Sequence, residues 1–201
     1  MNQFWDERYA PEKYYYGKEP NEFLKFCVDS NPPGRILLPG DGEGRNSVYA
    51  ASRGWDVYSF DLSKMGKKKA LQLASEMKVE INYEVCDLDD YVLEENAYDM
   101  IALIYVHLFP GQRILSHKRF IDALKPGGKL VMEVFSKKQL GKSSGGPKQL
   151  DLLYDLDELK VDFALLDISR AEELKVFKDE NSVSHHGEAE IIRFIGKKPI
   201  I

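Results

Sequence analysis

Residues 35–46, with the sequence RILLPGDGEGRN, decide the fold of this chain. Arg35–Pro39 is a short apolar run, which predicts a buried strand. Gly40–Gly44 is a tight glycine turn, and Arg45–Arg53 has a helical pattern. A glycine-rich turn between a first strand and a first helix lets the backbone approach a ligand closely and presents helix N–H groups to it. These residues therefore predict a ligand-binding turn at the end of a strand.

The alternation of strand and helix continues beyond this turn. The predicted strands are Trp55–Phe60, Glu80–Cys86, Asp99–Tyr105 and Lys129–Phe135; one predicted helix runs from a Ser63 cap to Met77, and another spans Gln112–Leu124 before Pro126-Gly127-Gly128. Strands that alternate with helices of about 10–15 residues are typical of βαβ units and a parallel sheet. Nearly all-apolar strands favour a sheet covered on both faces. The sequence thus predicts an α/β fold, a doubly wound, Rossmann-like three-layer sandwich.

The segments on either side of the core, residues 34–136, have a different character. Residues 1–33 predict a short helix, an aromatic loop and a helix over Glu22–Asp29 with Asn21 as its N-cap. The polar stretch Lys137–Lys148 predicts a mobile loop that is a candidate gate. Residues 137–201 further predict a helix at Asp155–Val161 and an antiparallel pair of strands, Phe163–Phe177 and Glu188–Lys197. A length of 201 residues fits a single domain over 1–201.

Composition argues against several classes of partner. The net charge is -5 with both signs spread along the chain, so we expect no nucleic-acid partner. The one tight basic run, Lys67–Lys69, is expected to be a solvated helix face. The N-terminus lacks the apolar segment of a signal peptide, and no apolar run approaches the roughly 20 residues that cross a bilayer. We therefore expect no membrane partner.

The two cysteines, Cys27 and Cys86, are far apart and match no metal-ligand spacing, so we expect no metal site. Both lie in apolar strings, which predicts core thiols. Free thiols favour a reducing, cytoplasmic setting. The oligomeric state stays open between a monomer and a homodimer.

The glycines at positions 40, 42 and 44 form the pattern G-x-G-x-G. The dinucleotide fingerprint G-x-G-x-x-G would need glycine at position 45, where Arg45 stands. The phosphate loop G-x-x-x-x-G-K-[ST] is also missing, because no Lys-Ser/Thr pair follows the glycines. The turn therefore favours neither of these phosphate-binding classes.

Acidic residues follow the second and third predicted strands. Asp61 ends the second strand, about 20 positions after the turn, where doubly wound folds place an acceptor for ribose hydroxyls. Asp87 ends the third strand, where a carboxylate can accept a hydrogen bond from an adenine amino group. Ligands bind at this carboxyl edge of such sheets. The three strand ends together predict a site for an adenosine-bearing cofactor.

These residues resemble the class I S-adenosylmethionine-dependent methyltransferases. Residues 38–46, LPGDGEGRN, are similar to the family's first motif, and residues 124–130, LKPGGKL, to the turn into its fifth strand. Asp61 matches the family's ribose-binding acid, and Asp87-Leu88 its adenine-contacting position. The Gly44-Arg45-Asn46 extension, the Trp5 and Arg8 segment and the Tyr16-Gly17 loop resemble the tellurite-resistance and thiopurine methyltransferase-like branch.

The resemblance implies S-adenosyl-L-methionine as cofactor and a seven-stranded, mostly parallel sheet with an antiparallel last strand. The cofactor-binding residues it implies, together with neighbours of the same strand ends, are Trp5, Tyr16, Gly40, Asp41, Gly42, Glu43, Gly44, Arg45, Asn46, Asp61, Leu62, Ser63, Asp87, Leu88 and Tyr105. Trp5 and Tyr16 would form an aromatic lid, since aromatic rings attract a sulfonium cation. The alternative for these rings is ordinary packing of an N-terminal helix.

Two departures from the family's pattern bear on function. Many relatives carry an acid where this chain has Leu38, and Pro39 has no backbone donor. The methionine end of the cofactor must then be held by another group, for which Asp41, Glu43 and Arg45 are candidates. The Asp/Asn-Pro-Pro-Tyr/Phe motif is absent after the fourth strand, which argues against DNA adenine or protein glutamine as substrate.

Histidines supply the candidate catalytic groups. His107 follows the fourth strand and could orient a substrate or take a proton, or could simply bond a loop carbonyl. His185 and His186 precede the last strand, and two adjacent residues of an extended segment cannot both face one pocket. A solvated turn is the alternative for this pair. His117 is expected to lie exposed in mid-helix.

The sequence as a whole predicts an enzyme, a methyltransferase that acts on a small molecule by direct in-line transfer. The protein would mainly supply proximity and alignment, because the cofactor carries the electrophilic methyl group. A soft chalcogen or thiol compound is one acceptor suggested by the branch. The alternatives are a non-catalytic S-adenosylmethionine-binding sensor or interaction module, and an NAD(P)-dependent oxidoreductase, against which Arg45 weighs.

Overall fold

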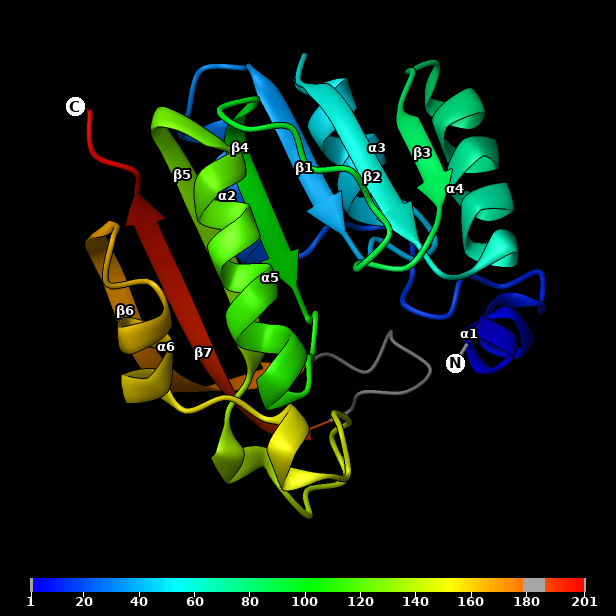
Figure 1. Cartoon of the computed structure of the whole chain (residues 1–201). Coiled ribbons are helices and arrows are strands. Elements are labelled where there is room, and N and C mark those ends of the chain that lie inside the picture. The colour runs from blue at the N-terminus through cyan, green and yellow to red at the C-terminus, as the bar shows by residue number, and fades with distance from the viewer. Residues whose placement is uncertain (1, 179–186, 201) are drawn as a thin grey trace. The chain divides into compact units, whose positions relative to one another are not determined.

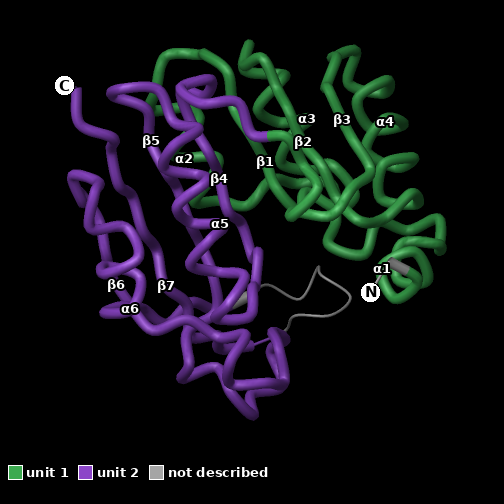
Figure 2. The backbone as a smooth tube through the Cα atoms, viewed as in Figure 1, with its two compact units in different colours: residues 1–92 green, residues 93–201 purple. Residues whose placement is uncertain are grey.

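The structure is a computed structural model that describes residues 2–178 and 187–200 (Figure 1). The chain divides into two compact units, residues 1–92 and residues 93–201, called unit 1 and unit 2 (Figure 2). In the described residues, no helix is both long enough and apolar enough to cross a membrane.

Unit 1 is built around three parallel strands in the order β3-β2-β1. Its elements are α1 (Asn2–Tyr9), α2 (Glu22–Asp29), β1 (Arg35–Pro39), α3 (Arg45–Ser52), β2 (Asp56–Asp61), α4 (Lys64–Met77) and β3 (Asn82–Val85). Pairing aligns Pro39 with Phe60, and Asp61 with Val85. The carboxyl ends of the three strands therefore meet at one edge of the sheet.

Side-chain caps fix the starts of two helices in unit 1. The Asn21 side chain accepts a hydrogen bond from Leu24 N at 2.9 Å, and the Ser63 hydroxyl accepts one from Gly66 N at 2.9 Å. Each cap satisfies an N–H group that the first turn of a helix leaves unpaired. Both N-caps and the bounds predicted for α2 are confirmed.

Unit 2 contains the parallel pair β4 and β5, and an antiparallel pair of strands follows them in the chain. Its elements are β4 (Tyr98–Ile104), α5 (Pro110–Ala123), β5 (Leu124–Phe135), the short 3-10 helices η1 (Lys137–Gln139) and η2 (Leu150–Leu152), α6 (Leu156–Asp162), β6 (Asp167–Lys178) and β7 (Gly187–Lys197). The strand order is β4-β5-β7-β6, with β7 antiparallel to both of its neighbours. The predicted α/β fold with seven strands and an antiparallel last strand is confirmed.

Three element boundaries in unit 2 differ from the prediction by two residues or more, and one of them is the start of β6, at Asp167 rather than Phe163. Helix α5 begins at Pro110 rather than Gln112, because proline suits the first turn of a helix, where no N–H partner is needed. Strand β5 begins at Leu124, so the Pro126-Gly127-Gly128 stretch belongs to the strand, beside a register shift between Tyr98 and Met100. A Cβ at Gly128 would lie 2.8 Å from the Tyr98 carbonyl oxygen, which explains the glycine.

Three predicted environments were wrong. His117 is almost fully buried, because its ring stacks on Phe163 and its Nδ1 lies 2.9 Å from Asp162 Oδ2 at the end of α6. Lys69 is buried rather than solvated, because it pairs with an acid of the glycine turn. Cys86 is only partly buried, although Cys27 is a core thiol as predicted. For His117 and Lys69, the deciding partner is distant in sequence.

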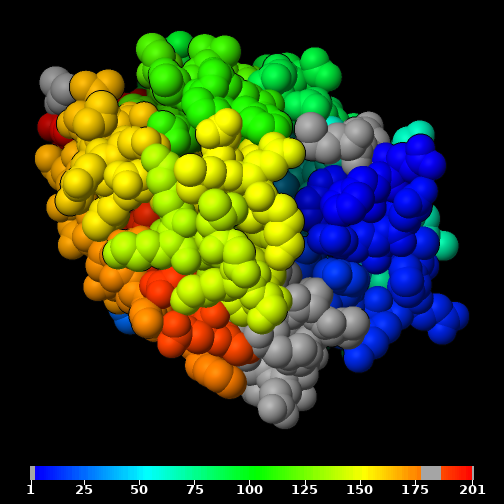
Figure 3. All heavy atoms as spheres, turned by 90° about the horizontal axis from the view of Figure 1, so that it is seen from below, coloured from blue at the N-terminus to red at the C-terminus, as the bar shows by residue number. Residues whose placement is uncertain are grey.

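The Lys137–Lys148 segment lies at the surface in Figure 3, but its centre is packed. The buried Gln139 side chain donates to Ser144 Oγ and to Gly145 O, both at 2.9 Å, and accepts from Glu190 N at 2.8 Å. A buried glutamine with all these partners fixes the loop at one point. Its action as a gate stays a prediction.

Candidate functional site

The glycine turn of unit 1 has a backbone that only glycine adopts without strain. Gly40, Gly42 and Gly44 have φ angles of 62°, 59° and 84°, in the left-handed region that a Cβ disfavours. The turn is tied to the neighbouring strand by the Gly40 N–H, which donates to Phe60 O at 2.8 Å. Gly44 then begins α3, and its carbonyl accepts from Val48 N at 2.9 Å. The predicted turn is therefore present.

Asp61, the last residue of β2, links this turn to the next helix. Its carboxylate accepts hydrogen bonds from Gly42 N at 3.1 Å and from Ser63 N at 2.9 Å. Burial raises the pKa of Asp61, and these backbone N–H groups oppose the shift. An ionised carboxylate has about four acceptor positions. Two are thus used within the chain, which leaves acceptor capacity for a pair of hydroxyl groups.

Asp87 and Leu88 follow β3 at the same edge of the sheet. Cys86 N donates to Asp61 O at 3.1 Å, which brings the end of β3 beside the end of β2. The Asp87 side chain accepts from Asp89 N at 3.2 Å, as in a turn-forming aspartate. Leu88 is buried. The three strand ends that the sequence singled out are therefore neighbours in unit 1.

Asp41 is the most unusual group of the turn. Its side chain is buried, and neither carboxylate oxygen has a hydrogen-bond partner of normal geometry among the described residues. Burial raises the pKa of Asp41 to about 7, although Ser47 and the charge of Arg45 oppose the shift. The Ser47 hydroxyl donates instead to Gly44 O at 3.0 Å. A buried acid without such a partner is costly, which marks it as a candidate for ligand contact.

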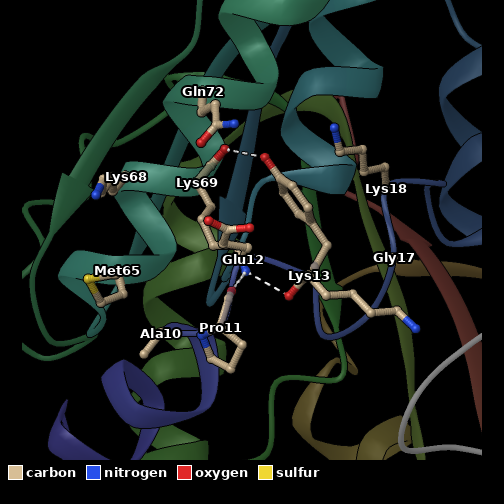
Figure 4. Close-up of a pocket in the computed structure, with 11 residues that line it drawn as sticks. Ala10, Pro11, Glu12, Lys13, Gly17, Lys18, Met65, Lys68, Lys69 and Gln72 are labelled. Atoms are coloured by element: carbon tan, nitrogen blue, oxygen red, sulfur yellow. Dashed lines mark hydrogen bonds between the residues drawn. The ribbon is translucent and has the colours of Figure 1, made fainter.

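Glu43 forms a buried ion pair with Lys69 of α4. Its carboxylate lies 2.6 Å from Lys69 Nζ and also accepts from Tyr15 N at 2.7 Å. The Lys69 ammonium donates in addition to the carbonyls of Pro11 and Lys13, as Figure 4 shows. The pair therefore fastens residues 10–18, which we call the strap, to α4 and to the glycine turn.

Arg45 and Asn46 hold the same N-terminal region. Arg45 donates to Tyr16 O at 3.2 Å, and the Asn46 side chain accepts from Asn21 N at 2.9 Å. With Glu43, these residues connect the turn to the segment before β1. As direct cofactor contacts, all three remain predictions.

The aromatic residues of the N-terminal segment pack against one another. Trp5 stacks on Tyr9 with ring centroids 5.6 Å apart, and the Tyr9 and Tyr16 rings meet edge to face at 6.5 Å. A Cβ at Gly42 would lie 2.7 Å from the Tyr9 hydroxyl oxygen, so α1 rests directly on the glycine turn. In the structure, Trp5 and Tyr16 thus belong to a packed aromatic group. Tyr9 of this group contacts the turn, and the role of Trp5 and Tyr16 as a lid stays a prediction.

Sequence reasoning missed Asp6, Tyr9, Lys69 and Tyr83. Asp6 accepts from Ser63 Oγ at 2.6 Å and from Met65 N at 3.0 Å, which docks α1 on the start of α4. The Tyr83 hydroxyl donates to Gly42 O at 2.6 Å. The four-residue spacing of Trp5 and Tyr9 was the one available signal, since such residues share a helix face. The partners of the other three lie too far away in sequence.

The remaining candidates belong to unit 2. Tyr105, at the end of β4, has a φ of 57°, and its hydroxyl donates to Glu133 at 2.7 Å. Such a backbone angle is uncommon outside glycine and is found at functional sites. The His107 ring lies against Phe135, and its Nδ1 is 2.7 Å from Leu152 O. Because a carbonyl can only accept, that nitrogen carries a proton. His185 and His186 lie outside the described residues.

A pocket of about 770 Å³ opens beside the strap, lined from α4 by Lys68, Lys69 and Gln72 (Figure 4). Its lining includes neither the glycine turn nor Asp61. We therefore do not assign it to the cofactor. Among the described residues, no group of three histidine, cysteine or acidic side chains is arranged to hold a metal ion.

The arrangement fits S-adenosylmethionine in unit 1. The left-handed glycines allow close approach of a ligand to the start of α3, Asp61 keeps acceptor capacity for hydroxyls, and Asp41 is a buried acid without a normal partner. The Leu38 side chain is buried and apolar, so it cannot supply the missing acid.

Comparisons with known proteins agree with this fit. A methyltransferase-domain family profile matches residues 36–128. The chain is 32% identical over 136 residues to a probable thiol methyltransferase 2 and 29% identical over 117 residues to a phosphoethanolamine N-methyltransferase 3, both from Arabidopsis thaliana. These matches cover 64% and 58% of this chain, but only 58% and 24% of the two relatives.

The fold of the chain also resembles that of a solved methyltransferase structure. The structure of the N-methyltransferase NodS from Bradyrhizobium japonicum, in complex with S-adenosyl-L-homocysteine, superposes with a TM-score of 0.74 at 13% identity, covering 98% of each chain. At that identity the likeness concerns the fold alone. The family profile and the relatives show that residues 36–128 are similar to a methyltransferase domain, and the fold of the chain is that of class I S-adenosylmethionine-dependent methyltransferases such as NodS.

Proposed function

We propose that the chain binds S-adenosylmethionine at the carboxyl edge of β1, β2 and β3 and catalyses methyl transfer to a small molecule. The observation that carries this proposal is the hydrogen bond between the glycine turn and Asp61, whose carboxylate accepts from Gly42 N at 3.1 Å. The bond fixes the ribose acceptor relative to the cradle before any ligand arrives. Preorganised contacts of this kind lower the cost of binding.

Each side chain of the site has a proposed part. Asp61 accepts from the ribose hydroxyls, and Asp87 and Leu88 hold the adenine. The N–H groups at the start of α3 face the cofactor across Gly42 and Gly44. Trp5 and Tyr16, beside Tyr9, cover it. The bound cofactor supplies an electrophilic methyl group, and the chain supplies its orientation and keeps water away.

The proposed acceptor is a thiol or another soft chalcogen compound. One Arabidopsis thaliana relative is a probable thiol methyltransferase, and this supports a sulfur acceptor. A thiolate needs no strong general base, because it is already a good nucleophile near neutral pH. Tyr105, as a cofactor contact, and His107, as a group that orients the acceptor, stay predictions from the sequence.

Calorimetry separates this proposal from the alternatives. Titration with S-adenosylmethionine, S-adenosylhomocysteine and NAD should show binding of the first two and none of NAD. Binding of NAD alone would overturn the proposal in favour of an oxidoreductase.

A turnover assay then tests the acceptor. Thiols, selenite, tellurite and amines are supplied with S-adenosylmethionine, and S-adenosylhomocysteine is measured. We expect product with a thiol or chalcogen compound. Product with amines alone would overturn the proposed sulfur or chalcogen acceptor and favour a nitrogen acceptor. Tight cofactor binding without product from any acceptor would favour a sensor.

A further inference from the structure

We propose that Asp41 is the counter-ion for the α-ammonium group of S-adenosylmethionine. The inference rests on the proposed function, since it names the group that holds the amino-acid end of the cofactor in that site. The juxtaposition that carries it is a buried carboxylate in the middle of the glycine turn, with no normal hydrogen-bond partner among the described residues.

The other polar groups near the turn are engaged elsewhere. Glu43 is paired with Lys69 and with the strap amide of Tyr15. Arg45 carries the wrong sign for an ammonium group and donates to Tyr16 O. Asp61 accepts from two backbone N–H groups. Asp41 is thus the acid of the turn with both oxygens still available.

The surroundings of Asp41 explain why it needs a cation. Asp61, at the end of β2, adds a negative charge, and Tyr83 of β3 lies within electrostatic range. On the side of α3, Ser47 and the Arg45 charge favour the ionised form. Burial outweighs them and raises the pKa of Asp41 to about 7. A cation placed against this carboxylate would reverse the shift.

The same position costs the free protein stability. A buried ionisable group without a normal partner destabilises the fold, so the presence of Asp41 at this position is better explained by function than by stability. Strain of this kind is characteristic of binding sites. Since neither oxygen is open to solvent, the ammonium group reaches Asp41 only after the side chain or a covering segment moves. The α1 residues that rest on Gly42 are candidates for that movement.

The test compares two ligands that share the adenosine part, of which only S-adenosylmethionine has the sulfonium charge and the amino-acid end. S-adenosylmethionine carries the α-ammonium group, whereas 5′-methylthioadenosine has the same nucleoside without it. Affinities are measured by calorimetry for the wild type, for Asp41→Asn and for the control Asp56→Asn, which changes an exposed acid at the start of β2. Asp41→Asn should weaken S-adenosylmethionine about tenfold or more, as expected for loss of a charge-assisted contact.

Methylthioadenosine affinity should stay within about threefold in Asp41→Asn, because that ligand lacks the group that Asp41 contacts. The thermal midpoint of the free variant should be unchanged or higher, because a buried charge has been removed. Equal loss for both ligands, or unchanged S-adenosylmethionine affinity, would overturn the proposal. If the wild type binds neither ligand, the proposed function itself fails and the role of Asp41 fails with it.

A second measurement needs no variant. Between pH 7.5 and pH 6.0, the ionised fraction of a group with a pKa of about 7 falls from about three quarters to about one tenth. The ammonium group becomes slightly more protonated over the same interval, because α-amino groups have pKa values of about 7.7–8.0. Wild-type affinity for S-adenosylmethionine should therefore fall about fivefold while that for methylthioadenosine is constant. Parallel pH profiles for the two ligands would overturn the proposal even if Asp41→Asn did not fold.

Discussion

Breaking the buried pair between Glu43 and Lys69 should destabilise the protein far more than breaking a surface pair. The two side chains are 3% and 8% exposed, and Lys69 Nζ lies 2.6 Å from the Glu43 carboxylate. Lys69→Met keeps the length of the side chain and removes its charge. Glu43 is then left buried with only the strap amides as donors. Loss of one partner of a buried pair costs about 3–5 kcal/mol.

The pair also makes the two single changes non-additive. Glu43→Gln leaves the Lys69 ammonium buried with the carbonyls of Pro11 and Lys13 alone. Once one charge of the pair has been removed, removal of the other eliminates the unpaired buried charge and so costs little further stability. The double variant should therefore lose about as much stability as either single variant, so the coupling free energy should equal one single loss, about 3–5 kcal/mol.

Urea unfolding followed by circular dichroism gives the free energies by linear extrapolation. Hydrogen exchange of the Tyr15 and Tyr16 amides, which donate to Glu43, reports the strap itself and should accelerate in both single variants. The matched control is Lys118→Met, which breaks the exposed Lys118–Asp122 pair of α5 and should cost less than about 0.5 kcal/mol. Single-variant losses as small as the control, or strictly additive losses, would refute the reasoning.

Three further predictions concern single residues. Asp61→Ala should weaken S-adenosylmethionine and methylthioadenosine alike by about 1–3 kcal/mol, because both carry the ribose; calorimetry showing unchanged affinities would remove its ribose role. Burial lowers the pKa of His117, so as the pH falls this histidine takes up its proton in the unfolded chain before it does so in the folded protein. The stability of the wild type relative to His117→Asn should therefore fall as the pH drops below about 6.5. Thermal unfolding at several pH values measures this difference, and a constant difference would contradict it. His107→Ala should lose turnover with cofactor affinity retained, and full activity in the methyl-transfer assay would return His107 to a structural role.

Local signals explain why much of the fold was predictable. The bounds of α2 and the caps Asn21 and Ser63 are confirmed because a side-chain oxygen two or three residues before its N–H partner is visible in sequence. The glycine turn is predictable because three glycines within five residues have few other uses. By contrast, the start of β5 was misplaced, because its first residues join the strand through pairing with Tyr98 of β4 and hydrogen bonds with Lys198, both distant in sequence.

The site divides in the same way. The sequence by itself determined the strand ends of unit 1, because parallel strands place their carboxyl ends at one edge, where Asp61 is the last residue of β2 and Asp87 lies just beyond β3. It could not tell Asp41 from Glu43, two acids two residues apart in the same turn. Only the tertiary structure decided that Glu43 is paired with Lys69, 26 positions away, while Asp41 is buried without a normal partner. The physical reason is that burial and charge pairing depend on which distant segments pack against a residue, whereas turns, caps and strand ends depend on its immediate neighbours.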